Sequence, residues 1–182
     1  AWARPLAAEP GQVFAYDNSV TPLLVAVLEK ATGMPLADYT RQQLVGPMDF
    51  AEPRYQGSIA HLRTLDMAKL GQLYLQRGEW DGKPLVPATY VDASVQAQSA
   101  GGPPVGLPYG QLWWVVPGKA PRPTFMASGW GGQLIWVYPP LDLVAATTST
   151  VSAASGQRGQ ALQWIRQQAF AAAQRRVAAE PN

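Results

Sequence analysis

The sequence predicts an α+β protein in which a helical region is followed by antiparallel strands and a C-terminal helix packed on the sheet. Three observations predict this order. Apolar residues recur at helical spacing through the first half, aromatic and β-branched runs follow after residue 105, and a last helical stripe closes the sequence. Of the 182 residues, 47% are hydrophobic and 14% are charged, so a packed core is expected.

The first helix is expected directly after Asn18 or Ser19, either of which can cap it, with Pro22 in its first turn. Gly33 should end it, because glycine readily adopts the left-handed conformation common after a helix. The residues at helical spacing between them are Leu23, Leu24, Val27, Leu28 and Ala31. This stripe predicts a helix with one apolar face.

The remaining elements of the first half follow from the same periodicity. A second helix is expected over residues 35–45 and a loop over residues 49–60. Thr64 should cap a third helix that ends at Gly78 and turns four side chains to the core, those of Met67, Leu70, Leu73 and Tyr74. A turn over 78–87 and a short helix over 87–97 complete this region.

A linker rich in glycine and proline, residues 101–104, precedes the strands. Strands are expected over residues 109–116, 133–138 and 143–149, to which residues 125–128 can add a short one, and a final helix is expected over 156–177. The short connection 139–142 should make the last two strands an antiparallel hairpin. We therefore divide the chain into a helical region, 1–105, and a sheet-and-helix region, 106–182, within one domain. The sheet should hold about three strands and leave one edge open.

Composition excludes several classes of function. The net charge is +2, without the basic patch that binds nucleic acid. There is no cysteine, hence no disulfide framework, thiolate nucleophile or zinc–thiolate site. No apolar run approaches the roughly 18 residues of a membrane span. No metal-ligand cluster or phosphate-binding loop occurs, so no cofactor is expected.

The sequence contains no recognisable nucleophile for acyl transfer. In a Ser-x-x-Lys motif one helical face presents both side chains, so that the amine can take the hydroxyl proton. The residues three positions before the four lysines are Val27, Asp66, Trp80 and Val116, and none of them is serine. A Gly-x-Ser-x-Gly elbow is also absent, and the lone His61 has no partner typical of a catalytic group.

Two groups of residues can carry chemistry. Tyr16 and Asn18, two residues apart ahead of the first helix, can place a phenol and an amide at the lip of a cleft. The segment 127–133, Ala-Ser-Gly-Trp-Gly-Gly-Gln, can present backbone N–H groups to a ligand oxygen. Each has a purely structural interpretation as well, the first as a half-buried tyrosine beside a capping asparagine, the second as a glycine-rich hairpin turn.

Taken together, these segments resemble the serine β-lactamase/DD-peptidase superfamily, in particular its class C-like esterase and amidase branch, which includes hydrolases of the 6-aminohexanoate dimer. The resemblance is carried by the pattern Pro-Gly-x-x-Phe-x-Tyr-x-Asn and by four further stretches in the same order, EKATGMPLADY, RTLDMAKLGQLYLQRGEWDGKPLVP, YGQLWW and ASGWGGQLIWVYPPLDLVAATTS. It covers nearly the whole chain and implies the C-terminal part of a β-lactamase-like fold.

The resemblance also implies roles for the two groups. A serine of such enzymes attacks a carbonyl and forms an acyl-enzyme that water hydrolyses. Tyr16 would pass the proton, Asn18 would hold a substrate amide or orient the lysine, and the backbone N–H of Trp130 would form half of the oxyanion hole. Residues that would line the substrate pocket are Ser128, Gly129 and Gln133. Because the ordinary pKa of a phenol is about 10, a tyrosine can act as a base only beside a cation.

Two departures from the superfamily pattern qualify this interpretation. Its Lys-Thr-Gly or His-x-Gly triplet reads Ala127-Ser128-Gly129, so the cation that engages a substrate carboxylate is missing and esterase or amidase activity is expected over β-lactamase activity. The Ser-x-x-Lys helix and two strands that come before the tyrosine in the superfamily are not in these residues.

From the second departure we expect a truncated form, a processed fragment or one half of a clipped pair, inactive alone, whose N-terminal segment or a second chain completes the sheet. The alternatives are a non-catalytic module that binds peptide or cell-wall fragments and an unrelated α+β structural protein. The resemblance favours a periplasmic or secreted location.

Overall fold

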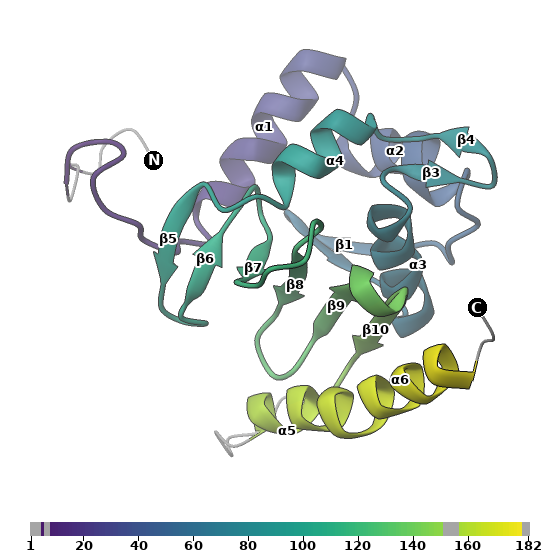
Figure 1. Ribbon diagram of the computed structural model, residues 1–182. Helices are drawn as coiled ribbons and strands as arrows, with labels where there is room; N and C mark the ends of the chain where they lie inside the picture. The colour runs from purple at the N-terminus through teal and green to yellow at the C-terminus, as the bar shows by residue number, and fades with distance from the viewer. Residues whose placement is uncertain (1–4, 6–7, 151–156, 180–182) are drawn as a thin grey trace.

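The structure is a computed structural model that describes residues 5, 8–150 and 157–179 (Figure 1). Its helices are α1 (Val20–Thr32), α2 (Leu36–Thr40), the π-helical η1 (Arg41–Val45), α3 (Thr64–Leu75), α4 (Ala88–Ser94), the 3₁₀ turn η2 (Pro139–Leu141), α5 (Gln157–Trp164), the π-helical η3 (Ile165–Ala169) and α6 (Phe170–Ala179). All helices expected from the sequence are present.

The main sheet has six strands in the order β10-β9-β8-β7-β6-β5, all antiparallel. They are β5 (Ser99–Gly102), β6 (Leu107–Tyr109), β7 (Trp114–Val116), β8 (Thr124–Ser128), β9 (Leu134–Tyr138) and β10 (Leu143–Thr147). The expected hairpin of β9 and β10 is confirmed, with Leu143 opposite Tyr138. Along the described chain, no strand pairs with the outer edge of β10.

The expectation of about three strands was wrong, because residues 124–128 form a full strand, β8, and for two further local reasons. The single strand predicted over 109–116 is two strands, because the chain reverses between Tyr109 and Trp114 and Leu112 takes a positive φ of 66°. β5 overlaps the first two residues of the expected linker and pairs with β6 although Gly101 and Gly102 have low strand propensity. A side chain at Gly101 would overlap the Leu107 carbonyl, so glycine allows the two strands to approach there.

Helices cover the two faces of the sheet. On one face α3 packs over β9 and β10, and its Met67, Leu70 and Tyr74 contact a core that includes the buried Phe125 and Ile135. On the other face lies the continuous helix of α5, η3 and α6, which crosses the lower end of the sheet in Figure 1. The core on this face of the sheet consists of Trp114, Met126, Leu134, Trp136 and Ile165. Successive strand residues thus alternate between two cores, as the period of two predicts.

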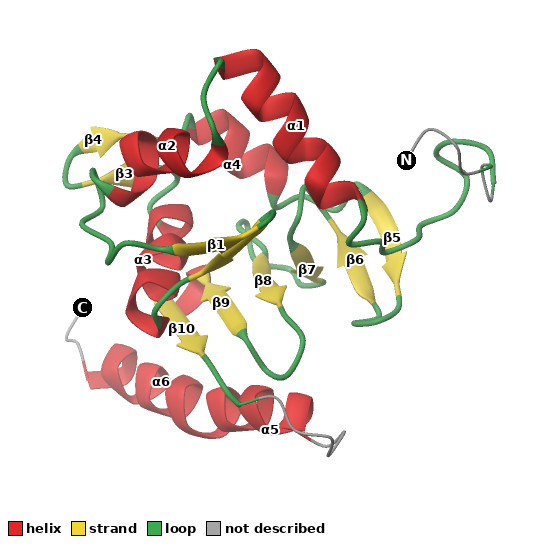
Figure 2. Ribbon diagram, turned by 180° about the vertical axis from the view of Figure 1, so that it is seen from behind, coloured by secondary structure: helices red, strands yellow, loops and turns green. Residues whose placement is uncertain are grey.

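Two small hairpins lie where the sequence predicted a loop and a turn. β1 (Arg54–Gln56) pairs with β2 (Ile59–His61) across Gly57 and Ser58, and Figure 2 shows this pair on the side away from α5 and α6. β3 (Glu79–Trp80) pairs with β4 (Lys83–Pro84) across Asp81 and Gly82, both at positive φ. Gly-Ser and Asp-Gly are two-residue hairpin signals, but strands this short show no alternation to support them.

Helix α1 begins and ends as predicted, yet its entrance and its environment differ. Ser19 is the N-cap and makes no side-chain capping bond; the Asp17 carboxylate accepts the Ser19 N–H at 2.8 Å instead. Gly33 closes the helix in the left-handed conformation. Three side chains of the predicted apolar stripe are exposed, those of Leu23, Leu24 and Val27, and so is Val20 at the start of the helix. No single helix in the described residues is long and apolar enough to cross a membrane. The two helical stretches Val20–Thr32 and Leu36–Val45, which are bent against each other, reach the required length and apolar composition when they are taken together.

The start of α3 is fixed by a buried carboxylate rather than by the predicted Thr64 cap. Arg63 is the N-cap, and its guanidinium donates to both carboxylate oxygens of the fully buried Asp66, at 2.9 and 3.3 Å. The Thr64 hydroxyl instead contacts that of Thr148, at 2.7 Å. The bonds from Arg63 outweigh the effect of burial and hold the pKa of Asp66 below its ordinary value.

Asp66→Asn should therefore lower the free energy of unfolding at pH 7 by about 1–2 kcal/mol, the low end for a charged hydrogen bond because Arg63 faces water. A lowered carboxyl pKa stabilises the fold above the ordinary value, and this contribution is lost as pH falls through the lowered value. Urea unfolding at pH 7, 5 and 3 should show that the gap in the free energy of unfolding between wild type and variant closes as the pH falls. The control is Asp38→Asn, since Asp38 pairs with Arg41 at the surface. A gap that widens toward pH 3 would contradict this assignment.

Candidate active site

Tyr16 lies in an extended segment that aromatic contacts hold against the sheet. The Phe14 ring packs on Tyr109 and Trp114, with centroids 5.4 and 5.9 Å away. Tyr16, two residues on, stacks on the same Trp114 at 5.5 Å and 25°, and meets Tyr109 edge-on at 6.0 Å. Trp114 is only 2% exposed and is therefore a fixed platform. Phe14 anchors the segment and Trp114 orients the phenol.

The two tyrosines of this cluster differ in environment. Burial, and secondarily the neighbouring Tyr16, raise the pKa of the Tyr109 phenol above its ordinary value. Tyr109 therefore remains protonated throughout the neutral range, and it is not suited to act as a base. Tyr16 is the more exposed of the pair and borders two cavities.

Tyr16, Ser128 and Gly129 separate these two cavities, so the site is a cleft with two lobes. The first lobe, of about 390 Å³, is further lined by Asn18, Pro104, Val105, Met126, Trp130, Leu134 and Leu162. The second, of about 270 Å³, is further lined by Met67, Tyr109, Leu112, Trp114, Ala127, Gln133 and Ile135. None of these described lining residues is Lys, Arg, His, Asp or Glu. The structure thus brings all six sequence-predicted residues to one cleft.

The glycine-rich segment forms the turn between β8 and β9. Ser128 pairs with Leu134 at the end of the ladder, and the Gly129 N–H donates to the Gln133 carbonyl at 2.7 Å. Trp130, at the outer bend, is 71% exposed. The turn is thus a hairpin, as the structural interpretation held, and it also lines the cleft, as the functional one required.

Gln133 lies at the cleft, and its side-chain amide has partners within the protein. Its side chain lines the second lobe, but its amide is bonded to the main chain of Ser149: Nε2 donates to the carbonyl at 3.2 Å and Oε1 accepts the N–H at 2.9 Å. Its stem also lies against Gly129, where an added Cβ would come within 3.0 Å of the Gln133 Cβ. The amide is therefore occupied by the protein itself.

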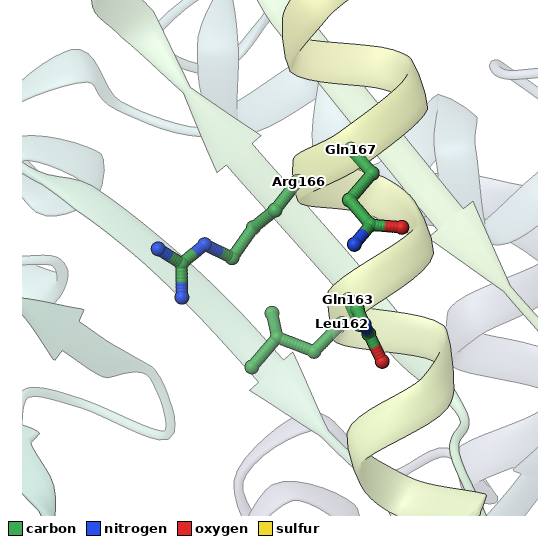
Figure 3. A pocket seen from close by; sticks show the side chains of 4 residues that line it. All are labelled: Leu162, Gln163, Arg166 and Gln167. Atoms are coloured by element: carbon green, nitrogen blue, oxygen red, sulfur yellow. The ribbon is translucent and has the colours of Figure 1, made fainter.

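Two further cavities lack reactive groups. One of about 460 Å³ lies against Leu162, Gln163, Arg166 and Gln167, which all come from one helical stretch (Figure 3). Another of about 380 Å³ contains Arg77 and Asp92, which pair with each other at 2.6 Å. The described residues include no group of three or more His, Asp or Glu side chains placed to hold a metal ion. The two-lobed cleft is therefore the candidate active site.

Several lining residues were not predicted from the sequence. Trp114 lies in the stretch YGQLWW, which signalled a strand but no role in orienting Tyr16. Val105 and Leu162 come from a loop and from α5, and no local pattern marks them as cleft residues. Thr147 and Ser149 lie within the expected strand 143–149, but the bonds of their hydroxyls to the glycine turn depend on the β9–β10 register and were not predicted.

Comparison with known proteins places this geometry in a family. The fold is similar to two solved structures, “Putative 6-aminohexanoate-dimer hydrolase from Bacillus anthracis” (22% identity, TM-score 0.69) and a beta-lactamase from Mycobacterium bovis (19%, 0.66). The alignments cover 96% and 88% of this chain but 47% and 66% of those proteins, so the chain spans about half the length of the first. No curated protein matches the sequence. A family model described as Beta-lactamase matches residues 3–170, and the chain therefore belongs to the beta-lactamase family.

Proposed function

We propose that this chain supplies the proton-transfer and oxyanion side of a serine hydrolase that cleaves esters or amides through an acyl-enzyme. The observation that carries the proposal is the meeting of Tyr16 with Ser128 and Gly129 in one cleft, from segments far apart in the sequence. A proton-transfer group beside a turn of backbone donors is the arrangement that acyl transfer needs. The fold class alone would not support it, since one fold serves many functions.

In this mechanism the serine oxygen attacks the carbonyl carbon while Tyr16 relays its proton toward the leaving group. The bond to the leaving alcohol or amine then breaks, and water hydrolyses the resulting acyl ester. The Trp130 N–H binds the carbonyl oxygen as it becomes negative, and Asn18 holds a polar group of the substrate. Since no cationic side chain is among the described lining residues, a lysine that activates Tyr16 has to come from elsewhere.

The serine and lysine are proposed to lie outside these 182 residues, because the sequence contains no Ser-x-x-Lys motif. The same proposal accounts for two exposed surfaces. The outer edge of β10 has no strand partner in the described chain, and α1 exposes Leu23, Leu24 and Val27. Unpaired edges and apolar patches are surfaces that other segments cover. We propose that a segment or second chain bearing the serine completes the sheet, and that the 182 residues alone are inactive.

The substrate is proposed to be a small uncharged ester or amide. Ala127 stands where the superfamily pattern has a cationic residue, and the described lining of both lobes is uncharged. A substrate carboxylate bound there would lose its hydration without gaining an ion pair. Penicillins and peptide carboxylates should therefore be poor substrates compared with neutral esters.

Fluorophosphonate labelling with intact-mass analysis tests the proposal. The probe forms a stable adduct with an activated serine, and we expect the adduct on the serine-bearing segment of the active assembly and none on the 182-residue chain alone. A folded assembly that binds peptide or cell-wall fragments but takes up no probe would replace the enzyme with a binding module.

A further inference from the structure

We infer that Leu112 sets the specificity of the second lobe, by forming an apolar wall against which an aliphatic chain of the ester or amide substrate packs. The inference rests on the proposed function and deepens it, because it names the part of the substrate that enters this lobe. Leu112 takes no part in proton transfer. Three observations carry the assignment: its backbone conformation, its exposure and its place in the cleft.

The backbone conformation of Leu112 is unusual for an apolar residue. Its φ of 66° lies in the left-handed region, where a Cβ atom is strained and glycine is favoured. The other described residues that have a positive φ without being glycine are Asp49, Arg77, Asp81 and Asp142. Aspartate tolerates this region because its short polar side chain can bond to the nearby main chain. Leu112 is the one apolar side chain in this described group, and no such local bond is open to it.

The fold fixes Leu112 in this conformation from both sides. The Gly110 N–H donates to the Trp113 carbonyl across the turn, at 2.8 Å. The Gln111 N–H donates to the Ser94 carbonyl at the end of α4, also at 2.8 Å, and a side chain at Gly110 would overlap that carbonyl. The Trp113 side chain, directly after Leu112, is buried in the core that α3 covers. Strained conformations persist where their surroundings fix them in this way, and they cluster at ligand sites.

The side chain of Leu112 gains little from the folded protein. It is 63% exposed. Exposure alone does not mark a site, because single exposed apolar side chains are common and Leu65 on α3 is 62% exposed. Leu65, however, lies in a regular helix and lines neither lobe. Leu112 combines exposure with a strained backbone and a place in the cleft, and contact with a substrate accounts for all three.

The second lobe has the apolar character that an aliphatic chain requires. Leu112 lines it together with three other apolar side chains, those of Met67, Ala127 and Ile135. The amide of Gln133, which also lines the lobe, is bonded to the protein main chain. The lobe has a volume of about 270 Å³ and adjoins the residues that it shares with the first lobe, beside which the reacting carbonyl is proposed to lie. A chain attached to that carbonyl can therefore extend into the second lobe and bury apolar surface there.

Leu112 should act on the binding of the chain rather than on the chemical step. Its contact with a non-reacting alkyl chain is the same in the ground state and in the transition state, so the contact lowers KM and leaves kcat unchanged. One methylene in an apolar pocket changes kcat/KM by about 10-fold or more. Leu112 is one of several apolar side chains in the lobe, so its truncation should lower the preference for a long chain over a short one by about 5-fold.

The test measures the ratio of kcat/KM between long and short esters for Leu112→Ala, Leu112→Gly and the matched control Leu65→Ala in the active assembly. One series varies the acyl chain, nitrophenyl hexanoate against nitrophenyl acetate, and the other varies the alcohol, hexyl acetate against ethyl acetate. We expect both Leu112 variants to lose about 5-fold of the ratio in one of the series, through a higher KM for the long ester. The control should keep the wild-type ratio.

Thermal unfolding of the same proteins tests the backbone strain separately. Leu112→Gly removes the Cβ atom and should raise the melting temperature by roughly 2–4 °C, because glycine adopts this φ without strain. Leu112→Ala keeps the Cβ atom and should leave the melting temperature unchanged. The alanine variant thus loses the chain contact without relief of strain. A glycine variant that melts no higher than the alanine variant would contradict the strain on which the inference stands.

The outcomes separate the inference from the proposed function. A lower ratio in the acyl series places the chain on the acyl side of the substrate, and a lower ratio in the alcohol series places it on the leaving-group side; either result supports the inference. Wild-type ratios in both series, or an equal loss in Leu65→Ala, would overturn it, while labelling of the serine would leave the hydrolase assignment standing. If the wild-type assembly takes up no fluorophosphonate, the proposed function fails, and the substrate contact of Leu112 fails with it.

Discussion

Tyr16→Phe should lower kcat of the active assembly by about 10²–10⁴, the range for loss of a general acid–base group. Phenylalanine keeps the ring that stacks on Trp114, so the fold and the cleft should persist while the proton path is lost. KM should change little, because the phenol acts mainly in the transition state. Steady-state kinetics on a neutral ester, with active serine counted by fluorophosphonate, gives both constants.

The matched control is Tyr138→Phe. Tyr138 also stacks on an aromatic ring, that of Phe170 at 4.8 Å, but it lies at the far end of β9 from the turn. This variant should retain wild-type kcat. Full activity in Tyr16→Phe would remove Tyr16 from the mechanism and leave the aromatic cluster as a packing feature.

Gly71→Leu should lower the free energy of unfolding by about 3 kcal/mol, the upper part of the range for overpacking a core. At Gly71 α3 comes close to the sheet: an added Cβ would lie 2.6 Å from Val144 Cγ1 and 2.9 Å from Ile135 Cγ2. Leucine favours helix over glycine by about 0.8 kcal/mol, which offsets only part of the clash. The midpoint of thermal unfolding should fall by roughly 6–12 °C.

Gly118→Leu is the control, because nothing lies within 4 Å of a Cβ at Gly118. Equal melting temperatures for the two variants would contradict the close approach of α3 to β9 and β10. The position also bears on the cleft. Met67, one turn before Gly71, lines the second lobe, so displacement of α3 should widen that lobe.

The elements predicted well from the sequence are those with long apolar periodicity. The period of 3.6 placed α1 and α3, and the run of β-branched and aromatic residues placed β9. The predictions failed where pairing with a neighbouring strand overrides the local secondary-structure propensity of the residues. β5 contains Gly101 and Gly102, which look like linker residues, and becomes a strand only because β6 lies beside it.

The residues of the candidate site divide in the same way, into those that a contiguous motif marks and those that only strand pairing brings to the site. Tyr16 and Trp130 were found because each lies in a contiguous motif, and the structure brings both to the first lobe. Trp114 and Ser149 could not be found in that way, since their roles depend on which strands pair and in which register. The substrate-pocket role of Gln133 stays a prediction, and the bonds between its amide and the main chain of Ser149 were not foreseen from the sequence.

The stacking of Tyr16 on Trp114 has an optical consequence. Two aromatic chromophores held 5.5 Å apart at a fixed angle couple electronically, which produces a near-ultraviolet circular dichroism signal. Such signals vanish when side chains lose their fixed packing. Trp114 also contacts Tyr109 and Phe14, so the difference spectrum between wild type and Tyr16→Leu, which leaves the buried Trp114 in place, gives the reporter for the seating of Tyr16. The reporter needs neither substrate nor serine, so it can follow the arrival of a partner segment at the cleft in real time.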